Sequence, residues 1–330
     1  MLYSLPISTN QKILLLRFSA IGDIVLTSPI IRCLKKQLGA EIHYLTKENY
    51  RSIVHSNPYV DKVYTINKRV GEVLPLLRQE KYDYLIDLHK NLRTLLIKAQ
   101  LPFIKTFTFN KLNIEKWLLV NFKINRLPKK HLVDRYFEGL QSLGIINDGQ
   151  GLDFFISQNR TALPVTLPNE YKVLVIGAGR ATKSLTTERL ATIINKCVQP
   201  VVLLGGPAEV RKAAEIVAQT KKSVHNLVGQ LTLEQSAYCV QQAKVVITGD
   251  TGLMHIAAAF QKPIYSIWGN TVPEFGMYPY YGASINQNKT LEVKNLSCRP
   301  CSKIGFDKCP KGHFKCMVDL DVDKIIDSSL

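Results

Sequence analysis

Apolar and polar positions alternate along the first half of the chain in the way expected for strands followed by helices. Helical spacing, closed by a glycine, predicts helices over 25–39 and 131–144. Short apolar runs rich in β-branched and aromatic residues predict strands over 12–18, 41–46, 62–66, 82–88 and 104–109. Strands that alternate with helices of this length indicate βαβ units and a parallel sheet.

The same alternation restarts after residues 157–170, a stretch with two prolines and few large apolar side chains that is typical of a linker. The second half predicts strands over 171–177, 200–206, 244–248 and 263–269, and helices over 186–198, 207–219, 231–243 and 253–260. We therefore predict an α/β protein of two doubly wound, Rossmann-like domains facing a cleft. The predicted boundaries are 1–160, 161–318 and a terminal helix, 319–330, that could return to the first domain.

The composition is that of a soluble globular protein, with 46% apolar and 21% charged residues among 330. The N-terminus lacks the features of a signal peptide, and no apolar stretch approaches the roughly 20 residues of a membrane span, so we expect a cytoplasmic location. The 43 lysines and arginines exceed the 26 acidic residues by 17. This excess indicates either an anionic partner or a solvated basic surface. Basic runs interleaved with aromatic residues are missing, which argues against nucleic acid.

The segment GAGRATK, residues 177–183, directly follows a predicted strand. It lacks the third glycine of the dinucleotide fingerprint, and the next strand does not end in an acidic residue, so a dehydrogenase is disfavoured. Its backbone amides, Thr182 and Lys183 suit a diphosphate. A tight turn with solvated cations is the alternative.

Two further segments join a strand to a helix, at the strand end where open α/β sheets bind ligands. In SAIGDIVLTSP, residues 19–29, Asp23 either caps the helix or serves as a general base. In GDTGLMHIAAAF, residues 249–260, helix amides and Thr251 favour a phosphate, which Gly252 lets approach closely. A carboxylate beside a phosphate is repulsive, so Asp250 should bind a sugar hydroxyl, His255 or Lys183. His255 itself is either a packed core residue or a phosphate ligand.

Taken in order, FSAIGDIVLTSPIIRCLKK, GAGRATK, LLGGPAE and GDTGLMHIAAA resemble glycosyltransferase family 9, the ADP-heptose:lipopolysaccharide heptosyltransferases. The resemblance extends from about residue 12 to residue 320. It implies the GT-B architecture, with the donor nucleotide in the second domain and the acceptor in the first. It also implies inverting transfer of a heptose from an ADP-sugar to the inner core of lipopolysaccharide, with no cofactor or metal required for catalysis.

The resemblance also assigns roles to particular residues. Asp23 matches the general base that deprotonates the acceptor hydroxyl. The donor-binding positions are Thr182, Lys183, Glu209, Asp250, Thr251, Gly252 and His255. By the same analogy Arg93 and Arg135 meet acidic groups of the acceptor, although a surface arginine is the alternative for each. The positive charge then fits an anionic lipopolysaccharide core and peripheral contact with the cytoplasmic face of the inner membrane.

Four of the seven cysteines lie close together, in SCRPCSKIGFDKCPKGHFKCM, residues 297–317. The opening C-x2-C fits a zinc knuckle but the closing spacing does not. The open alternatives for Cys298, Cys301, Cys309 and Cys316 are a structural zinc site, a labile disulfide pair and packed thiols.

A second function class also fits the two-domain pattern, because nucleotide-base recognition cannot be assigned from these motifs. The alternative is another GT-B enzyme that uses a UDP-sugar, either a transferase or an epimerase.

Overall fold

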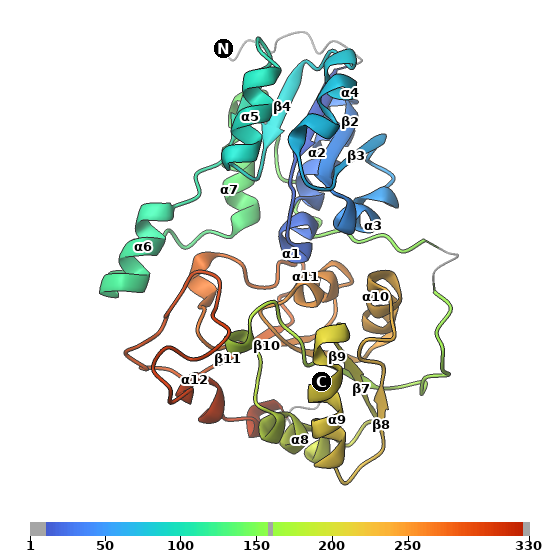
Figure 1. The fold of residues 1–330 in the computed structure, drawn as a ribbon, viewed down its shortest axis with the longest axis vertical. Coiled ribbons are helices and arrows are strands. Elements are labelled where there is room, and N and C mark those ends of the chain that lie inside the picture. The colour runs from blue at the N-terminus through green and yellow to red at the C-terminus, as the bar shows by residue number, and fades with distance from the viewer. Residues whose placement is uncertain (1–10, 158–160, 326–330) are drawn as a thin grey trace. The chain divides into compact units, whose positions relative to one another are not determined.

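The computed structural model describes residues 11–157 and 161–325 and divides the chain into two compact units (Figure 1). The first domain comprises the chain up to Lys111 together with Leu132–Phe155. The second domain comprises Leu112–His131 and the chain from Ile156 onward. The change of domain near residue 156 lies close to the predicted boundary at 160. The excursion over 112–131 carries no linker-like composition at its ends, and the sequence analysis did not anticipate it.

The first domain is built on a five-stranded, wholly parallel sheet in the order β3-β2-β1-β4-β5. The chain runs outward from β1 to β3 and then returns to place β4 on the other side of β1. The strands are β1 (Lys12–Leu16), β2 (Glu41–Lys47), β3 (Lys62–Ile66), β4 (Tyr84–Asp87) and β5 (Lys105–Thr108). Each of them falls within, or nearly within, a strand predicted from the sequence.

The helices of the first domain depart more from the prediction. The helix expected over 25–39 starts later, at Ser28, because a separate short helix precedes it; Gly39 follows its end as predicted. The helix expected over 131–144 stops at Glu138. Gly139 lies against β5 so closely that a Cβ there would be 2.3 Å from the Thr108 carbonyl oxygen. The helices are α1 (Ile21–Val25), α2 (Ser28–Leu38), α3 (Arg51–His55), α4 (Leu74–Gln79), α5 (Leu92–Gln100) and α7 (Leu132–Glu138).

The final segment of the first domain is fastened to α2 by one buried arginine. Arg32 binds Asp148 through two hydrogen bonds, of 2.7 and 2.8 Å, and also contacts Asp153 and the Gly151 carbonyl. A buried guanidinium must be paired, since an isolated buried charge is costly. Arg32 therefore holds the last segment of the first domain against α2, just before the chain enters the second domain.

The second domain repeats the same strand order with one more strand, β11-β10-β9-β6-β7-β8, again wholly parallel. Its central strands are buried on both faces, which explains their uninterrupted apolar sequences. The strands are β6 (Lys172–Val175), β7 (Val201–Leu204), β8 (Val224–Asn226), β9 (Val245–Gly249), β10 (Ile264–Trp268) and β11 (Asn288–Glu292). The outermost two, β8 and β11, are only partly buried and were not predicted.

Helices α8 and α9 pack together, as do α10 and α11. The bounds are α6 (Asn113–Phe122), α8 (Thr187–Lys196), α9 (Val210–Ala218), α10 (Leu233–Gln242), α11 (Gly252–Ala259) and α12 (Lys315–Val318). Among residues 11–157 and 161–325, none of the helices is long and apolar enough to cross a membrane.

The end of the described chain stays with the second domain. Leu320, Val322 and Ile325 are buried in its core. The terminal helix predicted over 319–330 falls partly on 326–330, outside the described residues, and there it stays a prediction. Within 319–325 the chain forms one short 3-10 helix, Asp323–Ile325.

Candidate functional site

The strand order of the second domain reverses between β6 and β9. The chain leaves the two strands toward opposite sides, so the loops at their carboxyl ends diverge. These loops carry GAGRATK after β6 and GDTG after β9. The fold thus brings together, at one switch point, two motifs that are about 70 residues apart in the sequence.

An ion pair joins the two loops. Lys183 Nζ lies 2.6 Å from Asp250 Oδ2, and the Thr271 hydroxyl donates to the same oxygen at 3.1 Å. Both charged side chains are mostly buried. Of the partners considered for Asp250 in the sequence, the structure shows Lys183. The pair holds the ammonium group at the switch point, where an anionic ligand would gain from it.

The turn after β9 begins helix α11. The Thr251 hydroxyl accepts a hydrogen bond from the Met254 amide at 3.4 Å and contacts the Thr248 hydroxyl at 2.9 Å. Thr251 is thus a helix cap, and Gly252 is the first helical residue. His255 is 1% exposed, which agrees with the packed-residue alternative. Phosphate binding by the amides of this first turn stays a prediction.

The loop after β6 is held in place from two sides. Thr182 is buried, and its hydroxyl accepts from the Phe306 amide at 2.8 Å and donates to the Phe306 carbonyl at 2.9 Å. Lys212 of α9 donates to the Ser184 hydroxyl at 2.5 Å and to the Leu185 carbonyl at 2.7 Å. Burial lowers the pKa of Lys212 to about 8. Thr182 and Lys212 therefore position the loop that carries Lys183.

Sequence reasoning missed Lys212 because VRKAAE reads as an ordinary exposed helix start. The contact of Lys212 with the loop after β6 becomes visible only in the fold, because there α9 begins next to that loop.

A cavity of about 720 Å³ opens beside this loop, within the size range of small-molecule sites. Glu209 lines it together with the start of α9, whereas Lys183 and Asp250 do not. One oxygen of Glu209 accepts the Gly206 amide at 2.8 Å, which fixes the carboxylate at the rim. The other residues that line the cavity include Gly179, Arg180, Thr187, Glu188 and Lys212.

The first domain has an equivalent switch point between β1 and β4, and Asp23 lies at it. Asp23 Oδ1 is 2.5 Å from Arg17 Nη2, and Oδ2 accepts the Ala20 amide at 3.1 Å. The capping role considered in the sequence is therefore present. The same contacts orient the carboxylate.

The loop after β4 adds a histidine near Asp23 that sequence reasoning did not single out. Asp87 Oδ1 accepts the amides of His89 at 3.1 Å and Lys90 at 2.6 Å, which folds this loop. Burial and the charge of Arg17 lower the pKa of His89 to about 4, so its ring is neutral at pH 7. Only the adjacency of β1 and β4 in the sheet brings His89 to the region of Asp23.

The two arginines assigned to the acceptor by resemblance differ in accessibility. Arg93 is exposed in the first turn of α5. Arg135 is 3% exposed within α7. The acceptor role stays a prediction for both residues.

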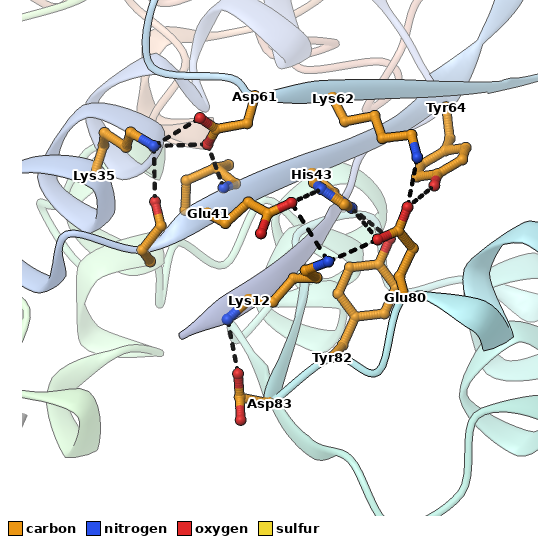
Figure 2. Close-up of polar contacts among 12 residues, drawn as sticks. Lys12, Lys35, Glu41, His43, Asp61, Lys62, Tyr64, Glu80, Tyr82 and Asp83 are labelled. Atoms are coloured by element: carbon orange, nitrogen blue, oxygen red, sulfur yellow. Dashed lines mark hydrogen bonds and ion pairs between the residues drawn. The ribbon is translucent and has the colours of Figure 1, made fainter. Parts of the chain in front are cut away.

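A separate polar cluster lies at the opposite, amino-terminal edge of the first sheet (Figure 2). Among the described residues, Glu41, His43 and Glu80 alone form a group with the spacing of a metal site. Lys12 Nζ lies 3.4 Å from Glu41 and 2.7 Å from Glu80, and Lys62 Nζ lies 2.5 Å from Glu80. Lysine charges thus already neutralise the carboxylates, so the cluster is a satisfied ion-pair network.

The four C-terminal cysteines form no disulfide in the structure. Cys316 is buried, whereas Cys298, Cys301 and Cys309 are partly exposed. Burial, with smaller effects from neighbouring thiols, raises the pKa of Cys301 to about 11 and that of Cys316 to about 12. Arg299, also in this segment, donates to the carbonyls of Val293 and Thr271 and thereby ties loops of the second domain together.

Comparison with known proteins agrees with this arrangement. A model of glycosyltransferase family 9 (heptosyltransferase) matches residues 72–308. Lipopolysaccharide heptosyltransferase 1 of Campylobacter coli is 22% identical over 291 residues, which cover 79% of this chain and 84% of that protein.

Two solved structures have the same fold. A glycosyl transferase family 9 protein from Veillonella parvula superimposes with a TM-score of 0.76 at 22% identity, covering 96% of this chain and 95% of that one. The E. coli ADP-heptose lps heptosyltransferase II gives a TM-score of 0.71 at 19% identity, covering 96% of both chains.

Two parallel-sheet α/β domains of this kind have the GT-B fold. The chain belongs to glycosyltransferase family 9, the heptosyltransferase family, whose relatives here are lipopolysaccharide heptosyltransferases.

The close approach of the two loops of the second domain can be tested at Gly249. A Cβ at this position would lie 2.4 Å from the Lys183 carbonyl oxygen, so Gly249→Ala must push the loops apart. We expect a loss of about 1–3 kcal/mol in the free energy of unfolding, measured by urea denaturation. Gly179→Ala is the matched control, because a Cβ there meets nothing within 4 Å. Equal stabilities of the two variants would contradict the close packing.

Proposed function

We propose that the protein is an inverting, metal-independent glycosyltransferase that moves a heptose from an ADP-sugar to the inner core of lipopolysaccharide. The observation that carries the proposal is the pair of switch points, one presenting Asp23 and the other the Lys183–Asp250 pair. The resemblance to a solved ADP-heptose heptosyltransferase supports the choice of donor.

The donor is assigned to the second domain. The amides at the start of α11 and the ammonium group of Lys183 would bind the diphosphate, with Gly252 leaving room for it. Asp250 holds Lys183 in position, and Thr251 caps the helix that begins at this turn. His255 is the donor-binding position that lies buried behind the turn. Glu209, at the rim of the cavity beside the loop after β6, suits a ribose hydroxyl. Thr182 contributes by anchoring that loop.

The base is assigned to the first domain. Asp23 would take the proton of an acceptor hydroxyl while that oxygen attacks the anomeric carbon of the heptose. The bond from this carbon to the ADP oxygen breaks on the opposite face, so the configuration inverts. ADP leaves with the bonding electrons, and Lys183 and the helix amides stabilise the negative charge that develops on it.

A metal is not required in this scheme. The leaving diphosphate is neutralised by a fixed ammonium group and by backbone amides, which supply the charge stabilisation that a divalent cation provides in other transferases.

The acceptor and its location follow from charge. The formal net charge of +17 suits an acceptor rich in carboxylates and phosphates. Arg93, exposed on α5, is available to such groups. The same charge favours peripheral attachment to the anionic cytoplasmic face of the inner membrane.

The role of Asp23 predicts a separation of turnover from binding. Asp23→Asn keeps an oxygen for the Ala20 amide but removes the base, so kcat should fall by about 10²–10⁴-fold. ADP affinity, measured by calorimetry, should stay unchanged. Glu170→Gln, which changes an exposed carboxylate of the second domain that is paired with Lys244, is the control and should retain turnover. Full turnover in the Asp23 variant would refute the assignment.

The role of Lys183 in holding the diphosphate predicts a change in ADP binding. In Lys183→Met, the loss of a charged contact should weaken ADP binding by about tenfold or more. Lys196→Met is the matched control, because its ion pair with Asp323 is exposed on α8. If both variants bind ADP as well as the wild type does, the phosphate site lies elsewhere.

The metal-free scheme predicts that chelation has no effect. Enzyme assayed with excess EDTA in metal-free buffer should keep its full kcat. A loss of activity that a divalent cation restores would overturn this part of the proposal.

A further inference from the structure

Helix α6 exposes one apolar face. Ile114, Trp117 and Phe122 are 73, 51 and 59% exposed. The rings of Trp117 and Phe122 stand edge to face with centroids 5.2 Å apart, so the two form one surface. Single exposed apolar residues are ordinary, but three large ones on one ten-residue helix form a patch that normally marks an interaction site.

The opposite face of α6 is packed, so the exposed face is not the result of a detached helix. Leu119 is buried with Val272 and Phe275, and Val120 packs against the same cluster. Lys123, just after the helix, donates to the Pro300 carbonyl at 2.8 Å. The helix is therefore fixed to the second domain while its outer face stays in water. An apolar face that stays exposed on a firmly packed helix points to an apolar environment outside this chain.

Positive charge surrounds the patch. Residues 111–130 contain one acidic residue, Glu115, and six basic residues: Lys111, Lys116, Lys123, Arg126, Lys129 and Lys130. The last four are exposed. Each basic residue near an anionic lipid surface contributes about 1 kcal/mol of attraction.

We propose that α6 and the basic segment after it, residues 113–130, are the element by which the protein docks on an anionic bilayer. Ten helical residues rise only about 15 Å, too little to span a bilayer but suited to lying in its interface. Tryptophan prefers that depth, and lysines reach the headgroups around it. A second copy of the chain would bring two basic segments together, and protein interfaces are depleted of lysine at their core.

This inference rests on the proposed function, since a lipid-linked acceptor is what gives membrane docking a purpose. The test uses sedimentation of the full chain with vesicles of phosphatidylcholine containing phosphatidylglycerol, and with vesicles of phosphatidylcholine alone. We expect binding to the anionic vesicles at low salt, and about tenfold weaker binding for the triple variant Ile114→Ser/Trp117→Ser/Phe122→Ser. The control is Val198→Ser/Val210→Ser/Ile285→Ser, which removes three exposed apolar side chains elsewhere on the second domain and should bind normally.

Fluorescence provides a direct readout of depth. The chain has two tryptophans, and the other, Trp268, is buried. Anionic vesicles should therefore shift the emission of Trp117 to the blue, and Trp117→Phe should abolish this shift while most of the binding remains. Unchanged emission, or equal vesicle binding by the two triple variants, would overturn the proposal. So would a dimer that the α6 triple variant converts to monomer, because the face would then be a self-interface.

Transfer to a soluble, delipidated acceptor saccharide separates the two proposals. An enzyme that transfers heptose but ignores anionic vesicles would refute the docking inference alone. An enzyme that docks through α6 but transfers no heptose would refute the proposed function alone.

Discussion

Both domains depend on one constraint, the reversal of strand order in a wholly parallel sheet. Parallel strands need crossover connections, and nearly all such connections are right-handed. When the chain adds strands first on one side of β1 or β6 and then on the other, its helices must cover opposite faces. The loops after β1 and β4, and those after β6 and β9, then diverge. The space between diverging loops is where side chains from distant parts of the sequence can meet a ligand.

The charged groups at these two positions are held before any ligand arrives. Arg17 and the Ala20 amide orient Asp23, and Asp250 with Thr271 orients Lys183. Such fixed charges act on a transition state without the cost of reorganising solvent, which is the main way proteins stabilise developing charge. The partly buried ammonium group of Lys212 extends this arrangement, because it holds the loop that carries Lys183.

The insertion that contains α6, Leu112–His131, interrupts the sequence of the first domain but folds as part of the second. It is flanked on both sides by first-domain chain, yet Leu119 packs on Val272 and Phe275 of the second domain. A sequence pattern cannot anticipate this, because the apolar residues of NIEKWLLVNF surround the helix and give no single buried face. Only the packing distinguishes the anchored side from the exposed one.

The sequence by itself determined the fold class, the central strands and the chemistry-bearing loops. Buried parallel strands must be continuously apolar, so they can be recognised in the sequence. The glycine-containing turns that carry Asp23, Lys183 and Asp250 can be recognised at the ends of these strands. Tertiary structure decided the rest. Strand neighbours decide the pairing of Lys183 with Asp250 and the approach of His89 to Asp23. Packing decides the burial of His255 and Arg135 and the contact of Lys212 with the loop after β6. Local sequence cannot predict these contacts, because the residues involved are far apart along the chain and come together only when it folds.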